Sequence, residues 1–141
     1  MARHRHLIET ADLERDWVEG ELFQLCDRLR SDTETEPVMR GKALYCLFYE
    51  PSFLTRTSFE RAAGLLGGEA HHTEDASQFF PVHTPSYIDN IINILGSLQI
   101  NLVVLRTGDD EVVARAAAAD AMPVVNGGSS RDHPTQALVD L

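Results

Sequence analysis

Side chains that can bind an anion gather just after an apolar run in the first half of the chain. The run at residues 43–49 has no alternating polar face, so it is typical of a buried strand. Between this strand and the next helical pattern lie four hydroxyls and one guanidinium: Ser52, Thr55, Arg56, Thr57 and Ser58. Unpaired backbone N–H groups and the positive end of the helix dipole meet at a helix start. The segment therefore predicts a site for phosphate or a similar anion.

Two later positions carry further candidate side chains. Arg106 follows the apolar run 102–105 and so stands at the carboxyl end of a predicted strand, where open parallel sheets bind ligands. His133 precedes Pro134, and proline suits the first position of a helix. Each candidate also has a purely structural interpretation. Arg106 then is a surface arginine, and His133, like the Ser52 and Thr55 hydroxyls, only caps a helix.

The elements that must position these side chains alternate along the chain. Apolar runs predict strands at residues 43–49, 102–105 and 123–125, and a further short strand is predicted at residues 69–72. Helical spacing predicts helices at residues 10–29, 58–66, 86–98 and 109–121, with Thr10 as the first N-cap and a last helix starting at Pro134. This alternation predicts an α/β fold, a parallel four-stranded sheet with helices on both faces.

Composition restricts the class of protein. The 141 residues, 43% of them hydrophobic, suffice for one core. No apolar run approaches membrane-spanning length and the N-terminus leads into no signal-peptide core, so we expect a cytoplasmic protein without membrane contact. The formal net charge of −10 repels polyanions and disfavours nucleic-acid binding. A local basic cleft can still hold a small dianion.

Three motifs together resemble one known family. The segment 50–60, Glu-Pro-Ser-Phe-Leu-Thr-Arg-Thr-Ser-Phe-Glu, resembles the carbamoyl-phosphate signature Glu-Pro-Ser-Thr-Arg-Thr-Arg-x-Ser-Phe-Glu of the aspartate/ornithine carbamoyltransferases. Residues 133–141 resemble that family's His-Pro-x-Gln helix start, and residues 102–106 its strand with a terminal arginine. Glu50-Pro51 and Asn126-Gly127-Gly128 are more similar to the aspartate branch. The resemblance covers only the first of the family's two domains, so we interpret residues 1–141 as a single carbamoyl-phosphate-binding-type domain, with the second, amino-acid-binding domain absent.

The resemblance implies a role for each candidate. Ser52, Thr55, Arg106, His133 and Gln136 would bind the substrate, with His133 and Arg106 as the catalytic pair. His133 would donate a hydrogen bond to the carbamoyl oxygen and polarise the carbonyl as an amine attacks. Gln136 would hold the carbamoyl amide. Arg56, mostly structural in the family, is expected to form a salt bridge.

Three positions depart from the family's pattern. Its loop threonine and arginine fall on Phe53 and Leu54, which offer no side-chain donor and no charge. Loss of a charge-assisted hydrogen bond to phosphate removes roughly 1.5–3 kcal/mol of interaction. The family's mobile-loop lysine has His83 at its place in an ungapped alignment. Two of the positive charges of the family's site are therefore absent or weakened.

These features leave several functions open. The chain would transfer a carbamoyl group to an amine only if a partner chain completes the site, as a homo-trimer or a complex with a chain carrying the second domain. The alternative is a non-catalytic regulatory or scaffolding subunit, and a further one is a transferase with a less charged donor. Whether the chain is an enzyme stays open. The resemblance implies no cofactor, and the adjacent His71 and His72 would point to opposite faces of a strand, which disfavours a metal site.

Overall fold

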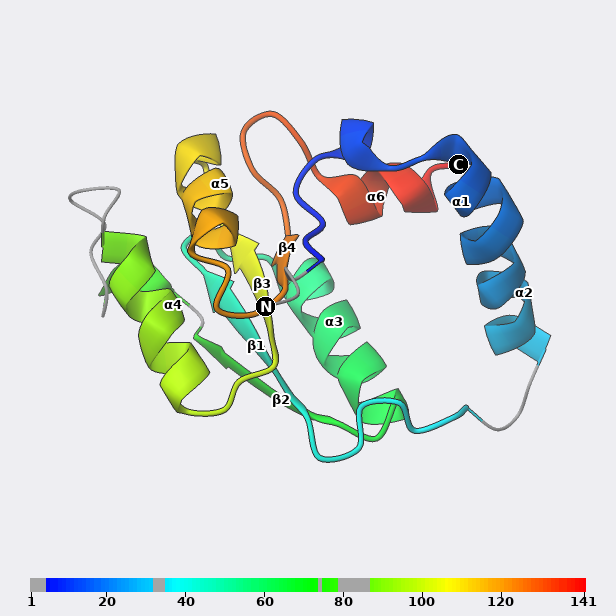
Figure 1. Cartoon of the computed structure of the whole chain (residues 1–141), viewed down its shortest axis with the longest axis horizontal. Helices are drawn as coiled ribbons and strands as arrows, with labels where there is room; N and C mark the ends of the chain where they lie inside the picture. The colour runs from blue at the N-terminus through cyan, green and yellow to red at the C-terminus, as the bar shows by residue number, and fades with distance from the viewer. Residues whose placement is uncertain (1–4, 32–34, 74, 79–86) are drawn as a thin grey trace.

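A four-stranded, all-parallel sheet with the order β2-β1-β3-β4 forms the centre of the molecule (Figure 1). The structure is a computed structural model that describes residues 5–31, 35–73, 75–78 and 87–141. Each strand lies within one residue of its predicted place at either end. The bounds are β1 (Ala43–Phe48), β2 (Glu69–Thr73), β3 (Leu102–Arg106) and β4 (Val124–Asn126).

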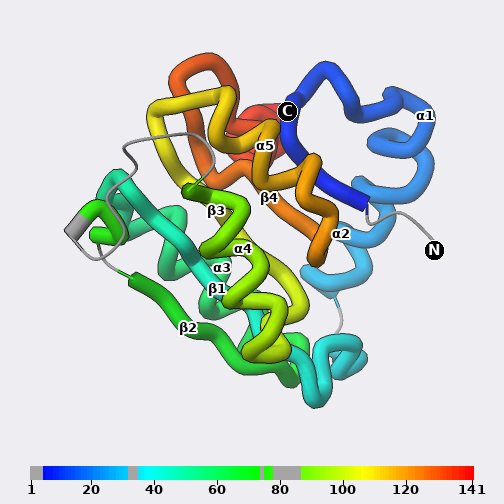
Figure 2. Tube along the Cα trace, turned by 60° about the vertical axis from the view of Figure 1, so that its left-hand side comes forward, coloured from blue at the N-terminus to red at the C-terminus, as the bar shows by residue number. Residues whose placement is uncertain are grey.

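Helices cover both faces of the sheet, as predicted. The first covering helix, α3, lies on one face, and α4 and α5 lie side by side on the other (Figures 1 and 2). A two-pronged ion pair links α4 and α5, since Arg115 donates through Nε and Nη2 to the Asp89 carboxylate at 2.9–3.2 Å. The bounds are α3 (Phe53–Leu65), α4 (Tyr87–Ser97), α5 (Asp110–Ala119) and the short α6 (Pro134–Val139).

Successive residues of the central strands enter two separate cores. In β1, Cys46 and Phe48 pack with Ala63 of α3, whereas Leu47 joins the other core with Ile92 of α4. β3 divides in the same way, with Val104 on the α3 side and its neighbours on the other. Because both faces are covered, neither face needs polar residues, which explains why these strands are continuous apolar runs in the sequence.

The helix after β1 begins five residues earlier than the sequence predicts. Its N-cap is Ser52 and its first residue is Phe53, not Ser58. The N–H of Arg56 already donates to the Ser52 carbonyl at 3.1 Å. Residues 53–57, expected as a loop, therefore form the first turn of α3. Phe53 and Leu54 consequently lie where a helix has unpaired N–H groups.

The N-terminal helix prediction is correct only in its later part. Helical structure runs from residue 15 to 31, and Thr10 does not cap it. Thr10 instead begins a 3-10 turn, and its hydroxyl donates to Asp132 at 2.5 Å.

In the described part of the chain, no helix is both long and apolar enough to cross a membrane. The bounds are η1 (Thr10–Asp12), α1 (Arg15–Trp17), the π-helical η2 (Val18–Leu22), α2 (Phe23–Ser31) and a 3-10 turn η3 (Ala76–Gln78) after β2.

Candidate functional site

The carboxyl ends of β1 and β3 bring the start of α3 beside Arg106. Phe48, the last residue of β1, is the register partner of Arg106, the last residue of β3. The next residue, Tyr49, donates its N–H to the Arg106 carbonyl at 2.8 Å. The chain order changes direction between these two central strands, because β2 lies outside β1 and β4 lies outside β3. Such a switch point is where open α/β sheets bind ligands.

Two nitrogens of the Arg106 guanidinium differ in their hydrogen bonding. Its Nη1 donates to the Gly127 carbonyl, in the loop after β4, at 2.8 Å. Its Nε is buried and has no hydrogen-bond partner among the residues that the structure describes. Buried polar groups are nearly always satisfied, and an unmade hydrogen bond to a charged donor costs more than one to a neutral group. The guanidinium is therefore arranged to receive an acceptor that the protein does not supply.

His133 presents a second donor next to this guanidinium. As the N-cap of α6, its Nδ1 accepts the N–H of Gln136 at 3.4 Å, and the Thr135 hydroxyl lies 3.4 Å from the same atom. We assign the proton of the neutral ring to Nε2, because Nδ1 acts as the acceptor. His133 Nε2 lies 3.4 Å from Arg106 Nη1, so two N–H groups lie side by side. An oxygen placed between them would accept from both.

The protonation state of His133 suits this role. Burial, and after it the positive charge of Arg106, lowers the pKa of His133 below its ordinary value. The imidazole is therefore neutral near pH 7 and donates through Nε2 without carrying a charge. It can polarise an oxygen, and as a neutral ring it adds no electrostatic repulsion toward Arg106.

Because Gly128 has no side chain, Arg106 and His133 can lie close to its backbone. A Cβ on Gly128 would lie 2.5 Å from Arg106 Nη1 and 3.1 Å from His133 Cδ2. Its φ of +122° lies in the region that side chains disfavour. Only glycine combines this backbone conformation with this close approach. Sequence reasoning missed Gly128 as a site residue, although two adjacent glycines after a strand are a signal for close backbone approach.

The first turn of α3 faces the same edge of the sheet with donors from its backbone. The hydroxyl of Ser52 makes no capping hydrogen bond, so the purely capping interpretation of Ser52 does not hold. Thr55 is half-buried. Phe53 and Leu54 are 77% and 74% exposed, which is high for large apolar side chains. The backbone of this turn can bind an anion, whereas two of its side chains add no donor.

The remaining candidate side chains have other partners or lie outside the described residues. The exposed Gln136 donates through Nε2 to Asp140 at 3.1 Å, along its own helix. His83 lies outside the described residues. His72 pairs with Glu60 of α3 at 2.5 Å and His71 with Glu69 at 3.3 Å, on opposite faces of β2. Within the described ranges, no three His, Cys, Asp or Glu residues come together as a metal site would require.

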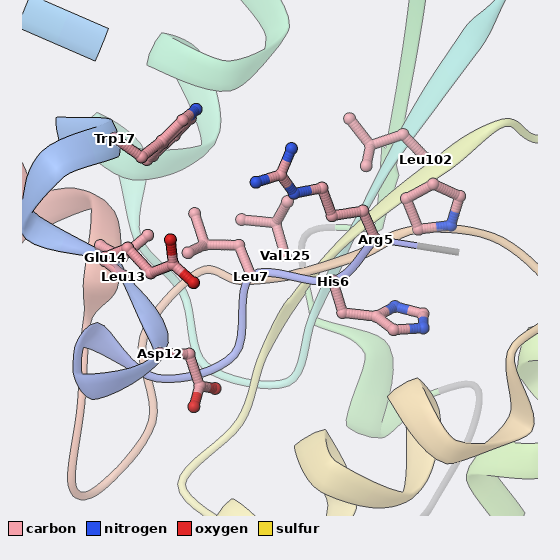
Figure 3. A pocket seen from close by; sticks show the side chains of 10 residues that line it. Arg5, His6, Leu7, Asp12, Leu13, Glu14, Trp17, Leu102 and Val125 are labelled. Carbon is pink, nitrogen blue, oxygen red and sulfur yellow. The ribbon is translucent and has the colours of Figure 1, made fainter. Parts of the chain in front are cut away.

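A cavity of about 300 Å³ lies elsewhere, between the N-terminal segment and α1 (Figure 3). Its walls include Leu7, Leu13 and Val125, and the Arg5 guanidinium stacks 5.5 Å from the Trp17 ring centroid at its rim. Neither Arg106 nor His133 lines it. The cavity is therefore separate from the cluster of donors at the sheet edge.

The sheet and its paired donors define an open α/β domain with a cluster of nitrogen donors at the strand ends. A family model described as aspartate/ornithine carbamoyltransferase, carbamoyl-P binding domain, matches residues 5–141. The chain therefore belongs to the aspartate/ornithine carbamoyltransferase family, and the resemblance seen in the sequence is confirmed. The motif matches at residues 50–60, 102–106 and 133–141 all fall inside this domain.

Individual relatives agree with this assignment. Aspartate carbamoyltransferase 3 of Pisum sativum is 33% identical over 138 residues, which are 96% of this chain and 35% of that one. The aspartate carbamoyltransferase catalytic subunit of Methanocaldococcus jannaschii is 35% identical over 144 residues, 97% of this chain and 45% of that one. Ornithine carbamoyltransferase of Thermus thermophilus superposes with a TM-score of 0.84 at 29% identity, covering 96% and 46%. The chain thus spans less than half the length of these relatives.

Proposed function

We propose that the site at the ends of β1 and β3 binds carbamoyl phosphate. The observation that carries this proposal is the buried, unsatisfied Nε of Arg106, on a guanidinium whose Nη1 lies 3.4 Å from His133 Nε2. The start of α3 supplies backbone N–H groups at the same edge, which suit a phosphate. A structural neighbour of 26% identity and TM-score 0.78, a mutant N-acetyl-L-ornithine transcarbamylase, is described as complexed with carbamyl phosphate. It supports the same ligand class here.

The geometry suits transfer of the carbamoyl group to an amine. In this reaction the amine nitrogen bonds to the carbonyl carbon, negative charge gathers on the carbonyl oxygen, and the C–O bond to phosphate breaks. The proton lost by the amine leaves with the phosphate. His133 and Arg106 would both donate to the oxygen as its charge grows, which stabilises the transition state more than the ground state.

Catalysis needs a second binding surface for the amine. Gln136 donates through Nε2 to Asp140, which leaves its Oε1 as the acceptor for the carbamoyl amide, and this chain spans less than half the length of its relatives. We propose that a partner chain completes the site, in a homo-trimer or in a complex with a chain carrying the amino-acid-binding domain. The family membership favours an aspartate carbamoyltransferase-like reaction, and hence a place in pyrimidine synthesis. Light scattering would measure the assembly, and a mass of three chains is the expected result.

A second candidate function rests on Phe53 and Leu54. Their exposed apolar side chains stand where the family signature has a threonine and an arginine, so the donor would bind weakly. A non-catalytic subunit that regulates or scaffolds a carbamoyltransferase would tolerate this loss. The two functions differ in turnover: a regulatory subunit carbamoylates no amine even in the complex purified from its native cell.

A calorimetric titration with carbamoyl phosphate tests the binding proposal. The wild-type chain should bind weakly, and the double variant Phe53→Thr with Leu54→Arg about tenfold or more tightly, because it restores a charge-assisted donor. Leu65→Arg is the matched control: it adds the same charge to an exposed position at the far end of α3. No binding by either the wild type or the double variant would refute the proposal. Equal gains in the double variant and in Leu65→Arg would show that net charge alone is responsible.

A further inference from the structure

The N-terminal segment His6–Thr10, here called the strap, runs beside β4 and the loop that carries His133. Leu7 forms a parallel bridge with Val125 (Figure 3). Its N–H donates to the Val124 carbonyl at 2.9 Å, and its carbonyl accepts the N–H of Asn126 at 2.8 Å. The strap thus continues the sheet at the β4 edge, where β4 itself has only three residues.

His6 fixes the first end of the strap. Its side chain is 9% exposed and lies on the opposite side of the strap from Leu7, toward α5 (Figure 3). Nδ1 accepts the N–H of Val124 at 3.0 Å, and Nε2 lies 2.9 Å from the carboxylate of Asp120. Two tertiary contacts therefore hold a residue that is far from β4 in the sequence.

Thr10 fixes the other end, directly beside His133. The N–H of Thr10 donates to Asp132 Oδ2 at 2.6 Å, and its hydroxyl donates to Oδ1 at 2.5 Å. The same Oδ1 accepts the backbone N–H of His133 at 2.8 Å. One carboxylate therefore joins the end of the strap to the backbone of the candidate catalytic residue.

Asn126 makes the connection between these two ends. It is 2% exposed, and its Nδ2 donates to the Ile8 carbonyl of the strap at 3.0 Å and to the Ser129 hydroxyl at 3.1 Å. Its Oδ1 accepts the N–H of Gly128 at 2.9 Å. Asn126 therefore joins the strap at Ile8 to Gly128 and Ser129 in the loop that leads to His133.

Asp132 is held in its charged form by these contacts. Burial alone would raise the pKa of Asp132, but the hydrogen bonds from Thr10 and from the His133 N–H outweigh it and lower the pKa below its ordinary value. The carboxylate is therefore a fully occupied acceptor near pH 7. It is not a free base that could take a proton during the reaction.

We propose that Thr10 and Asp132 are positioning residues that set the place of His133 against Arg106. The catalytic role of His133 rests on the proposed function, whereas the contacts that join Thr10, Asp132 and His133 do not depend on it. His133 Nε2 lies 3.4 Å from Arg106 Nη1 only while the start of α6 is fixed, and Asp132 fixes that start through the His133 N–H. A segment remote in sequence thereby controls the spacing of the two donors. The role proposed for Thr10 and Asp132 acts through the backbone N–H of His133 and needs no contact with a ligand.

Substitution of Thr10 separates positioning from plain stabilisation. Thr10→Val removes the hydroxyl but keeps the shape and the backbone N–H, whereas Thr10→Ser keeps the hydroxyl. In Thr10→Val we expect the His133 ring, followed by NMR, to titrate at a higher pKa, because the ring moves away from burial and from Arg106. Carbamoyl phosphate affinity should fall about fivefold, as expected for one hydrogen bond. Thr10→Ser should behave as wild type.

Two control variants show whether the changes in Thr10→Val are specific to the Thr10–Asp132 contact. Ile92→Val, in the core on the α4 side, lowers stability without removing a hydrogen bond of the strap, and Glu9→Gln changes an exposed strap residue. Both should leave the His133 titration unchanged. An unchanged titration in Thr10→Val, or an equal change in Ile92→Val, would overturn the proposal. If the wild type binds no carbamoyl phosphate, the proposed function fails, yet the His133 titration still decides the positioning question.

Asp132→Asn provides an independent test, because an electrostatic role and a positioning role of Asp132 predict opposite changes in ligand affinity. Removal of a negative charge near the site should tighten binding of a dianion if Asp132 acts only through its field. If Asp132 acts by position, the variant loses charge-assisted hydrogen bonds from Thr10 and binds carbamoyl phosphate more weakly than wild type. Tighter binding would therefore contradict the proposal, even if Thr10→Val proved too unstable to measure.

Discussion

At the scale of single residues, the candidate site depends on nitrogen donors of Arg106 and His133 that lie close together at the strand ends. Arg106 Nε is buried and unsatisfied, and His133 Nε2 carries the proton because Nδ1 accepts from the start of α6. Each of these side chains is fixed by a separate backbone contact, at Gly127 and Gln136. The donors are thus arranged before a ligand arrives, which reduces the cost of binding.

Arg106→Gln tests the contribution of the guanidinium. The affinity for carbamoyl phosphate should fall about tenfold or more, because a charge-assisted donor is worth roughly 1.5–3 kcal/mol. The pKa of His133 should rise, since the positive charge of Arg106 is one of its lowering causes, second to burial. Calorimetry and NMR titration measure these two effects. Arg15→Gln, which removes the same charge from a side chain 84% exposed, should change neither; matching losses in both variants would contradict a specific role for Arg106.

The sequence predicted Arg106 and His133 because strand ends and helix starts have local signals. It did not predict the state of Gln136, because the competing acceptor, Asp140, depends on the side-chain conformation along α6. Thr10 and Asp132 were missed as partners for a different reason. Their contact joins residues 122 positions apart, and a threonine before a helical pattern is locally indistinguishable from an N-cap.

At the scale of elements, the loop after β4 and the start of α3 determine the shape of the site. The start of α3 was predicted too late, because hydroxyls and exposed apolar residues at 53–57 give no apolar stripe. The central strands β1 and β3 were predicted more accurately, since burial on both faces leaves an uninterrupted apolar run. The loop after β4 depends on Gly128, whose backbone conformation the sequence suggests only through the adjacent glycines.

Gly128→Ala should disable the site and weaken the fold together. The new Cβ would lie 2.5 Å from Arg106 Nη1, so the guanidinium must leave its place, and the positive φ adds strain of roughly 1–3 kcal/mol. Urea denaturation and carbamoyl phosphate titration measure the two effects. Gly20→Ala is the matched control, because nothing lies within 4 Å of its Cβ and helical alanine is favoured over glycine. A stable Gly128→Ala protein with wild-type affinity would contradict the geometry described for Arg106.

At the scale of the whole molecule, the candidate site lies at the carboxyl ends of β1 and β3 in a small parallel sheet. The strap joins residues 6–10 to β4 and to the loop that carries His133. The alternation of strands and helices made the α/β fold class and the parallel sheet predictable from the sequence, whereas the order β2-β1-β3-β4 is known from the structure. The strap was not, since five residues beside β4 carry no periodic signal. The relatives' greater length means that the binding step, rather than transfer to an amine, is the property to measure first on these residues.

The most direct test of the account is NMR mapping of carbamoyl phosphate on the isotope-labelled chain. The ligand should shift the Arg106 Nε resonance, the amides of Phe53 to Thr55, the amide of Gly128 and the His133 ring, in one saturable process. The Trp17 indole, at the rim of the separate cavity, should not respond. Shifts centred on Trp17, or a saturating titration that leaves Arg106 Nε unchanged, would contradict the assignment of the site.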